Sequence, residues 1–326
     1  MLFLTACGEE KAKPDVKRLN QDIIPEIESL DKLITEEPNN AKLFFDRAQV
    51  YYNNEGYQEA IDDLGKAIDL DSSQVDYYHL LADSYLDNFK SREAVKVLKL
   101  CMVRFPNDTH TQLKLAEYYL ILKQYEKSIQ LAGTLLEREP SNPEGYFMMG
   151  MNYRAMQDTA RAKNSFQAAI ENDAELIDAW LILGDLYSAE NNDMALDYYN
   201  GALTADPNNI LAKHSKAYYL QNHGDIEQAQ KLYEEITLAD RSYILAPLNS
   251  GILYLEEKNY EKALEQFNII IGNSPQNALG HYYRGLTHQA LNQIDAAIED
   301  FQNSINLDPT DLRVREALKE AQKLRK

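Results

Sequence analysis

Cysteine is nearly absent from this chain: only Cys7 and Cys101 occur in 326 residues, which leaves room for at most one disulfide. The Cys/His spacings typical of a zinc site are missing as well. Basic residues are also scarce, with 33 Lys and Arg against 52 Asp and Glu and a formal net charge of −19. Because phosphate binding needs basic stripes, we expect no nucleic-acid partner.

Recognisable catalytic motifs are missing too. The sequence contains no Gly-rich phosphate loop, no His-Glu-x-x-His and no Gly-x-Ser-x-Gly. It has no β-rich stretch and no long Gly/Ser linker, so no segment remains for a separate catalytic domain. We therefore expect no enzymatic activity, no metal and no cofactor.

A regular ladder of small residues is present instead. Alanine or glycine recurs in steps of 34 residues, with a single step of 33, at Ala48, Ala82, Ala116, Gly150, Gly184, Ala217, Gly251 and Gly285. A second series keeps the same period at Ala60, Ala94, Ser128, Ala162, Ala195, Ala229, Ala263 and Ala297. A small residue that recurs at this interval is typical of a stacked repeat, in which two helices pack closely only where one side chain is small.

The residues between these series carry a family resemblance. Apolar positions stand at helical spacing, and prolines separate the helix pairs. One copy resembles the tetratricopeptide repeat almost throughout, with Trp180, Leu183, Gly184, Tyr187, Ala195, Tyr199, Ala202 and Pro207. The resemblance implies an all-α, right-handed solenoid of antiparallel helix pairs over residues 21–326. Eight full repeats would begin near Ala41, Val75, Thr109, Pro143, Ile177, Ile210, Ile244 and Ala278.

Two single helices complete this arrangement. Residues 22–37 read as an unpaired second helix with Leu30 and Leu33 facing inward, and residues 311–326 read as a closing helix. The series also assigns Cys101 to a small core position, as a packed thiol. Many of the 22 tyrosines fall at repeat core positions, where the ring fills space and the hydroxyl can reach the edge of the helix pair.

The resemblance also implies a binding groove, because the first helix of each pair lines the concave face in this family. Carried over position by position, the groove residues are Phe45, Gln49, His79, Asp83, Lys114, Glu117, Phe147, Met148, Met151, Leu181, Asp185, Tyr218 and Tyr282. The carboxylate clamp of chaperone-binding members is mostly absent from the matching positions, so that activity is not carried over. Apolar residues flanked by acids favour a basic, apolar peptide or helix, although some of these residues could only pack against neighbouring repeats.

The first residues resemble a second family. Leu4-Thr5-Ala6-Cys7 is similar to a bacterial lipobox, which implies cleavage before Cys7 and lipidation of that cysteine. Residues 1–6 would then be a signal remnant and residues 7–20 a polar tether. Since four residues are too short for an apolar signal core, we expect that the sequence begins late. The implied location is the cell envelope, on the outer membrane or the periplasmic face. The alternative is a cytoplasmic adaptor with a chance cysteine.

Three functional readings remain open. The leading one is a lipid-anchored scaffold that binds a polypeptide segment in the groove. The second is a structural assembly factor of an envelope complex that acts through its convex face or its ends. The third is an enzyme with a site between repeats, around His281, Tyr282 and His288.

Overall fold

The computed structural model describes residues 24–325, which form two compact units that divide after Asp158. Within this range every regular element is an α-helix, so the expected all-α fold is confirmed. The predictions that concern residues 1–23, including the signal remnant, the tether and the lipidated Cys7, lie outside the described residues.

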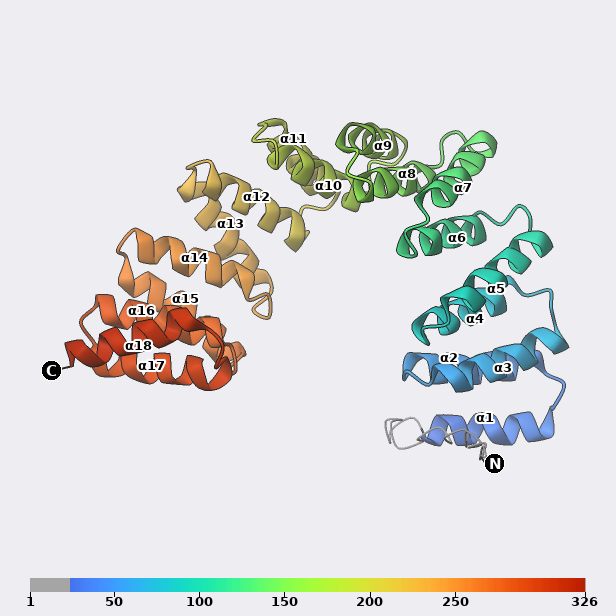
Figure 1. The fold of residues 1–326 in the computed structure, drawn as a ribbon, viewed down its shortest axis with the longest axis horizontal. Coiled ribbons are helices and arrows are strands. Elements are labelled where there is room, and N and C mark those ends of the chain that lie inside the picture. Colours follow the sequence, from blue (N-terminus) through green and yellow to red (C-terminus); the bar gives the residue numbers. More distant parts are fainter. Residues whose placement is uncertain (1–23, 326) are drawn as a thin grey trace, which may run out of the picture. The chain divides into compact units, whose positions relative to one another are not determined.

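The first unit contains helix pairs that stack in chain order, with one further helix before them and one after them (Figure 1). Its helices are α1 (Ile24–Glu36), α2 (Ala41–Asn53), α3 (Tyr57–Leu70), α4 (Val75–Asp87), α5 (Ser91–Arg104), α6 (Thr109–Ile121), α7 (Tyr125–Arg138) and α8 (Pro143–Ala155).

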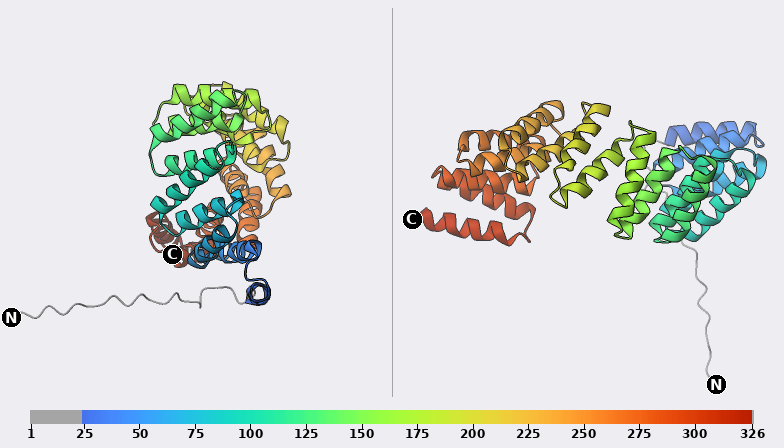
Figure 2. Two further views of the ribbon diagram at one scale, coloured as in Figure 1. Left: turned by 90° about the vertical axis from the view of Figure 1, so that its right-hand side faces the viewer. Right: turned by 90° about the horizontal axis from the view of Figure 1, so that it is seen from above.

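The second unit repeats this plan and ends in a single helix; Figure 2 shows both units from two further sides. Its helices are α9 (Thr159–Asn172), α10 (Ile177–Ser188), α11 (Met194–Ala205), α12 (Ile210–Asn222), α13 (Ile226–Ala239), α14 (Leu245–Glu256), α15 (Tyr260–Asn273), α16 (Ala278–Ala290), α17 (Ile294–Leu307) and α18 (Leu312–Leu324). We call the even-numbered helices first helices and the odd-numbered ones second helices.

Local sequence sets where the first helices begin. An Asn or Asp precedes most of them, and its side-chain oxygen accepts a hydrogen bond from a backbone N–H in the first turn. These capping residues are Asn40, Asp108, Asn142, Asn209, Asn277 and Asp311.

The turn inside each pair also has a fixed geometry. One residue per turn adopts left-handed backbone, with φ of 52–63° at Glu55, Phe89, Lys123, Gln157, Asn191, Lys258 and Asn292 and 87° at Gly224. In most of these turns the backbone N–H of the residue directly after the left-handed one donates a hydrogen bond of 2.7–3.1 Å to a tyrosine carbonyl at the end of the first helix. The accepting carbonyls are those of Tyr51, Tyr85, Tyr119, Tyr153, Tyr187 and Tyr254. This closure satisfies backbone acceptors at the helix end and directs the chain into the second helix.

The small-residue ladder lies where the helices of a pair meet. Every alanine of both series is 0% exposed, as is Ser128, and the four glycines of the first series are buried. Cys101 is also 0% exposed, as expected of a packed thiol. Burial raises the pKa of its thiol.

The choice between alanine and glycine follows the size of the facing residue. A Cβ on Gly285 would lie 2.7 Å from Cε1 of Phe301, and one on Gly251 would lie 2.6 Å from Cε1 of Phe267. Where the first helix carries Ala48 instead, Leu64 stands at the place of these aromatics. Tyr233, at the same place after Ala217, does not follow the rule.

Single helices cover both ends of the described range. In α1, Ile27, Leu30 and Ile34 are half-buried, and Ile34 packs against the core of the first pair. Leu33 is 42% exposed, so its predicted inward orientation is wrong. The spacing explains the error, since Leu30 and Ile34 share one face of the helix and Leu33 lies beside it.

The last helix, α18, buries an apolar stripe against the preceding pair. Val314, Ala317 and Ala321 contact the cluster around Phe301. Its Lys and Arg side chains lie largely on the opposite, exposed face. No helix within residues 24–325 is both long enough and apolar enough to span a bilayer.

The glycine rule makes a stability prediction. Gly285→Ala should lower the free energy of unfolding by about 1–3 kcal/mol, because the methyl group overlaps the Phe301 ring. Adding Phe301→Leu should recover part of this loss. Gly65→Ala is the control, since a Cβ there meets nothing within 4 Å, and it should stabilise α3 by about 0.5–1 kcal/mol. Urea titrations followed by circular dichroism test this; equal stability of Gly285→Ala and the unmodified chain would refute the rule.

Candidate interaction surface on the first helices

The predicted groove residues lie on the first helices, and in each unit we call the side on which they lie its first-helix face. In the first unit they come from α2, α4, α6 and α8, and in the second unit from α10, α12 and α16.

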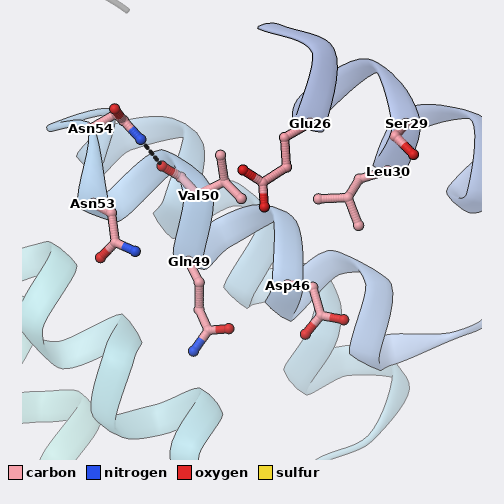
Figure 3. Close-up of a pocket in the computed structure, with 8 residues that line it drawn as sticks. All are labelled: Glu26, Ser29, Leu30, Asp46, Gln49, Val50, Asn53 and Asn54. Atoms are coloured by element: carbon pink, nitrogen blue, oxygen red, sulfur yellow. Dashed lines mark hydrogen bonds between the residues drawn. The ribbon is translucent and has the colours of Figure 1, made fainter. Parts of the chain in front are cut away.

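A polar recess of about 600 Å³ lies where α1 meets α2 (Figure 3). Glu26 and Leu30 extend from α1 toward Val50 of α2, and Asn54 donates to the carbonyl of Val50 over 2.8 Å. Gln49, a predicted groove residue, lines the recess and is exposed. This end of the first-helix face therefore offers polar contacts.

A second recess of about 510 Å³ lies between the start of α2 and the start of α4. Phe45, a predicted groove residue, packs there against Tyr77 with ring centroids 4.8 Å apart. Lys42 and Asp76 stand at its edge. The aromatic pair forms an apolar base between opposite charges.

Direct bonds join successive first helices in this unit. The hydroxyl of Tyr52 donates to Asp87 over 2.6 Å, and that of Tyr118 donates to Asp83. Burial, reinforced by the bond to Asp83, raises the pKa of Tyr118. Lys114 forms an ion pair with Asp83 at 2.9 Å. Lys114 and Asp83 thus largely neutralise one another, so Asp83 contributes less charge to a partner than the sequence indicates.

His79 is only 8% exposed, so it offers almost no surface to a partner, contrary to its placement in the groove. Its Nε2 lies 2.7 Å from the hydroxyl oxygen of Thr111, which donates to Asp108 over 2.5 Å. Because the Thr111 hydroxyl donates its proton to Asp108, its oxygen accepts the bond from His79, and the Nε2–H of His79 is the donor. Burial, together with the neighbouring His110, lowers the pKa of His79. The contact with α6 explains the burial.

The apolar centre of the predicted groove lies on α8. Phe147, Met148 and Met151 are each half-buried, so part of every side chain is accessible. The exposed carboxylates of Glu117 and Glu144 are on α6 and α8 of the same unit. No basic group of the described residues lies within 4.0 Å of either carboxylate.

In the second unit, Leu181 is 9% exposed and packs in a core cluster with Tyr199 and Tyr219. Its assignment to an accessible groove is therefore wrong, because the second helix of its own pair and the next first helix cover it. Asp185 is exposed and accepts a bond of 2.9 Å from the Tyr199 hydroxyl. Tyr218 is 52% exposed. Tyr282 is half-buried, and the Arg313 guanidinium lies 5.5 Å from its ring centroid.

The residues considered for an enzyme site form a packed ion cluster. Asp300 is 2% exposed and accepts two bonds from Arg284, at 2.7 and 2.9 Å. His281 lies 3.2 Å from the same carboxylate, and its other ring nitrogen contacts the carbonyl of Pro275. His288 is 3.7 Å from Asp300.

The first full repeat contains the same arrangement at equivalent positions. Arg47 binds Asp63 at 2.6 and 2.7 Å and also binds Asp31 of the preceding helix. Arg284 likewise reaches back to Asn268, at 2.9 Å. A cluster that recurs at fixed repeat positions is explained by packing. Within residues 24–325, no group of three His, Cys, Asp or Glu side chains is arranged to hold a metal ion.

The buried histidines predict acid sensitivity. Burial lowers the pKa of both His79 and His214 below the ordinary value of 6.5. The unfolded state then binds more protons than the native state, so the free energy of unfolding falls as pH drops below that value. The melting temperature should decrease from roughly pH 7 to pH 5. A His79→Gln/His214→Gln variant should show a smaller decrease; an equal one would contradict this account.

Comparison with known proteins identifies related sequences. A model of the tetratricopeptide repeat matches residues 147–210 and 214–278, and a second model of this repeat matches residues 278–311. A model described as anaphase-promoting complex, cyclosome, subunit 3 matches residues 26–101.

Individual relatives are distant. Anaphase-promoting complex subunit 3 of Schizosaccharomyces pombe is 21% identical over 60% of this chain and 29% of its own length. Superkiller protein 3 of the same organism is 23% identical over 87% of this chain and 19% of its own. This chain thus spans less than a third of either relative.

A solved structure shows the same fold. The Cut9–Hcn1 hetero-tetramer of the anaphase-promoting complex has a TM-score of 0.50 and 16% identity, and the match covers 92% of this chain and 59% of that one. The repeat pattern, the stacked helix pairs and the matching models agree. The chain belongs to the tetratricopeptide repeat family.

Proposed function

We propose that this chain is a non-catalytic protein-interaction scaffold whose first-helix face binds a polypeptide segment. Repeats of this family supply rigid surfaces for other proteins, and one relative named above, anaphase-promoting complex subunit 3, is a subunit of an assembly by its own name. The observation that carries the proposal is the accessible apolar group Phe147, Met148 and Met151 in a unit that also presents Glu117 and Glu144.

The chemistry of this surface favours a basic segment with apolar side chains. Methionine side chains are flexible and polarisable, so they adapt to irregular apolar partners. Unpaired carboxylates attract a cationic segment and set its orientation. The neutralisation of Asp83 by Lys114 concentrates this attraction on Asp76, Glu117 and Glu144, which are all exposed.

A matched pair of variants tests the surface. Phe147→Asp/Met151→Asp should abolish the recovery of specific partners when the tagged chain is purified from its source cells and analysed by mass spectrometry. Phe89→Asp/Met156→Asp makes the same chemical changes at turn positions that are 97% and 39% exposed, and should leave recovery unchanged. If both variants recover the partner proteins equally well and both have native circular dichroism, the proposal is wrong.

We also propose that Cys7 carries a lipid that anchors the chain to a bacterial envelope membrane. The support is the sequence Leu4-Thr5-Ala6-Cys7 and the polar segment after it. The anchor would place the interaction surface beside the membrane. The competing reading is a cytoplasmic adaptor with the same repeats and no anchor.

Metabolic labelling distinguishes these two readings. Radiolabelled palmitate should enter the chain expressed with its native upstream sequence, because the modified cysteine requires a signal segment. A Cys7→Ser variant expressed at the same level should stay unlabelled. Absence of label from both forms would favour the cytoplasmic reading.

The second candidate function is that of an assembly factor acting through other surfaces. The names of several relatives, including the BBSome complex member BBS4 of Bos taurus, describe subunits of multiprotein complexes. Under this reading the first-helix variant would keep its partners, so the same purification separates the two functions.

A further inference from the structure

An apolar cleft of about 590 Å³ opens on the second-helix side of the first unit, between α5 and α7. Leu115 and Tyr119 of α6 form its floor, and Met102, Val103 and Leu131 line its sides. Val103 is 81% exposed, although Leu115 and Tyr119 are buried. The cleft is separate from the first-helix face, because its walls are second helices.

The repeat pattern shows how the cleft differs from the first and last repeats. In the first full repeat the equivalent positions hold Asp31, Arg47 and Asp63, whose side chains bond across the three helices. In the last repeat they hold Asn268, Arg284 and Asp300, which bond in the same way. In the third repeat these positions are Lys99, Leu115 and Leu131. Without the cross-bonding guanidinium, an apolar floor is left open.

Two cations stand over this floor. The ammonium groups of Lys99 and Lys127 lie 6.0 and 5.3 Å from the centroid of the Tyr119 ring. No carboxylate of the described residues lies within 4.0 Å of either ammonium group. An adjoining recess of about 420 Å³ shares both lysines and adds Arg92 and Lys96.

This positive charge contrasts with the net negative charge of the chain. Helix α5 carries four basic residues and one acidic residue, in a protein with a net charge of −19. The second helices α3 and α17 carry more acidic than basic residues. The local field at the cleft therefore favours an anionic partner, and the floor favours an apolar side chain.

Exposure of an apolar residue at the repeat position of Val103 is not sufficient by itself to indicate a docking site. Leu238 of α13 holds the position equivalent to Val103 and is 80% exposed. Glu234 of α13 stands at the position of Lys99, whereas Lys262 of α15 stands at that of Lys127. Leu238 thus supplies a control with the same exposure and a carboxylate in place of one of the two ammonium groups.

From this combination we propose that the α5–α7 cleft docks an acidic polypeptide segment whose aliphatic or aromatic side chain inserts between Val103 and Leu131. Carboxylates on both sides of that side chain pair with Lys99 and Lys127. The partner differs in charge from the basic segment proposed for the first-helix face, so one chain binds two polypeptides of opposite character.

The test begins with a random-peptide phage library panned on the full chain. We expect an enriched group of peptides that combine Asp or Glu with Leu, Ile, Phe or Trp. A labelled synthetic copy should bind with a Kd that is weakened about tenfold or more by Val103→Asp and by Lys99→Glu/Lys127→Glu, measured by fluorescence anisotropy. Added salt should weaken binding to the unmodified chain.

Matched controls keep the result interpretable. Leu238→Asp repeats the apolar change, and Lys66→Glu/Lys231→Glu repeats the charge change on exposed positions of α3 and α13. Both controls should leave the Kd within about twofold. Failure to enrich acidic peptides would overturn the proposal, as would equal effects of the cleft and control variants. A dimer that sedimentation detects and Val103→Asp dissociates would also overturn it, because the occupant would be a second copy.

Discussion

The close approach of two helices at a pair of small side chains is the constraint on which the rest of this structure depends. The alanines of both ladder series are 0% exposed. Where the facing residue is Phe267 or Phe301, its ring occupies the space that an alanine methyl group would need. The first helix therefore has Gly251 opposite Phe267 and Gly285 opposite Phe301. The crossing fixes the turn between the helices, and that turn fixes which carbonyls are capped. Most tyrosines and the buried thiol of Cys101 follow as packing residues.

The fold could be predicted from the sequence because the same pattern of packing residues recurs in each repeat. The wrong predictions for groove residues concern side chains whose burial depends on one neighbouring repeat. His79 lies on a first helix as predicted, but Thr111 and His110 of the next repeat bury it. Leu181 is covered in the same way. The groove positions carried over from the family indicate the helix face on which a side chain lies. They do not indicate which residues of the adjacent repeat cover that side chain.

An alignment of the repeats with each other reveals the positions of the Arg–Asp clusters in the sequence. Arg47 and Asp63 occupy the same positions as Arg284 and Asp300, whereas Leu81, Leu115 and Leu183 stand at the arginine position in three intermediate repeats. The clusters explain why His281 and His288 need no catalytic role. At the α5–α7 cleft the same three positions are Lys99, Leu115 and Leu131, and the guanidinium is missing. Positions at which one repeat differs from the others thus indicate candidate functional sites more clearly than residue type alone does.

The central claim is that accessible first-helix side chains contact a partner polypeptide, and photo-cross-linking in cells measures this most directly. Benzoylphenylalanine would replace Met151 in one form, Tyr218 in a second and Leu307, a 40% exposed residue at the end of α17, in a third. We expect discrete protein adducts from Met151 or Tyr218 and none from Leu307. Adducts from Leu307 alone, or identical adducts from all three positions, would contradict the central claim.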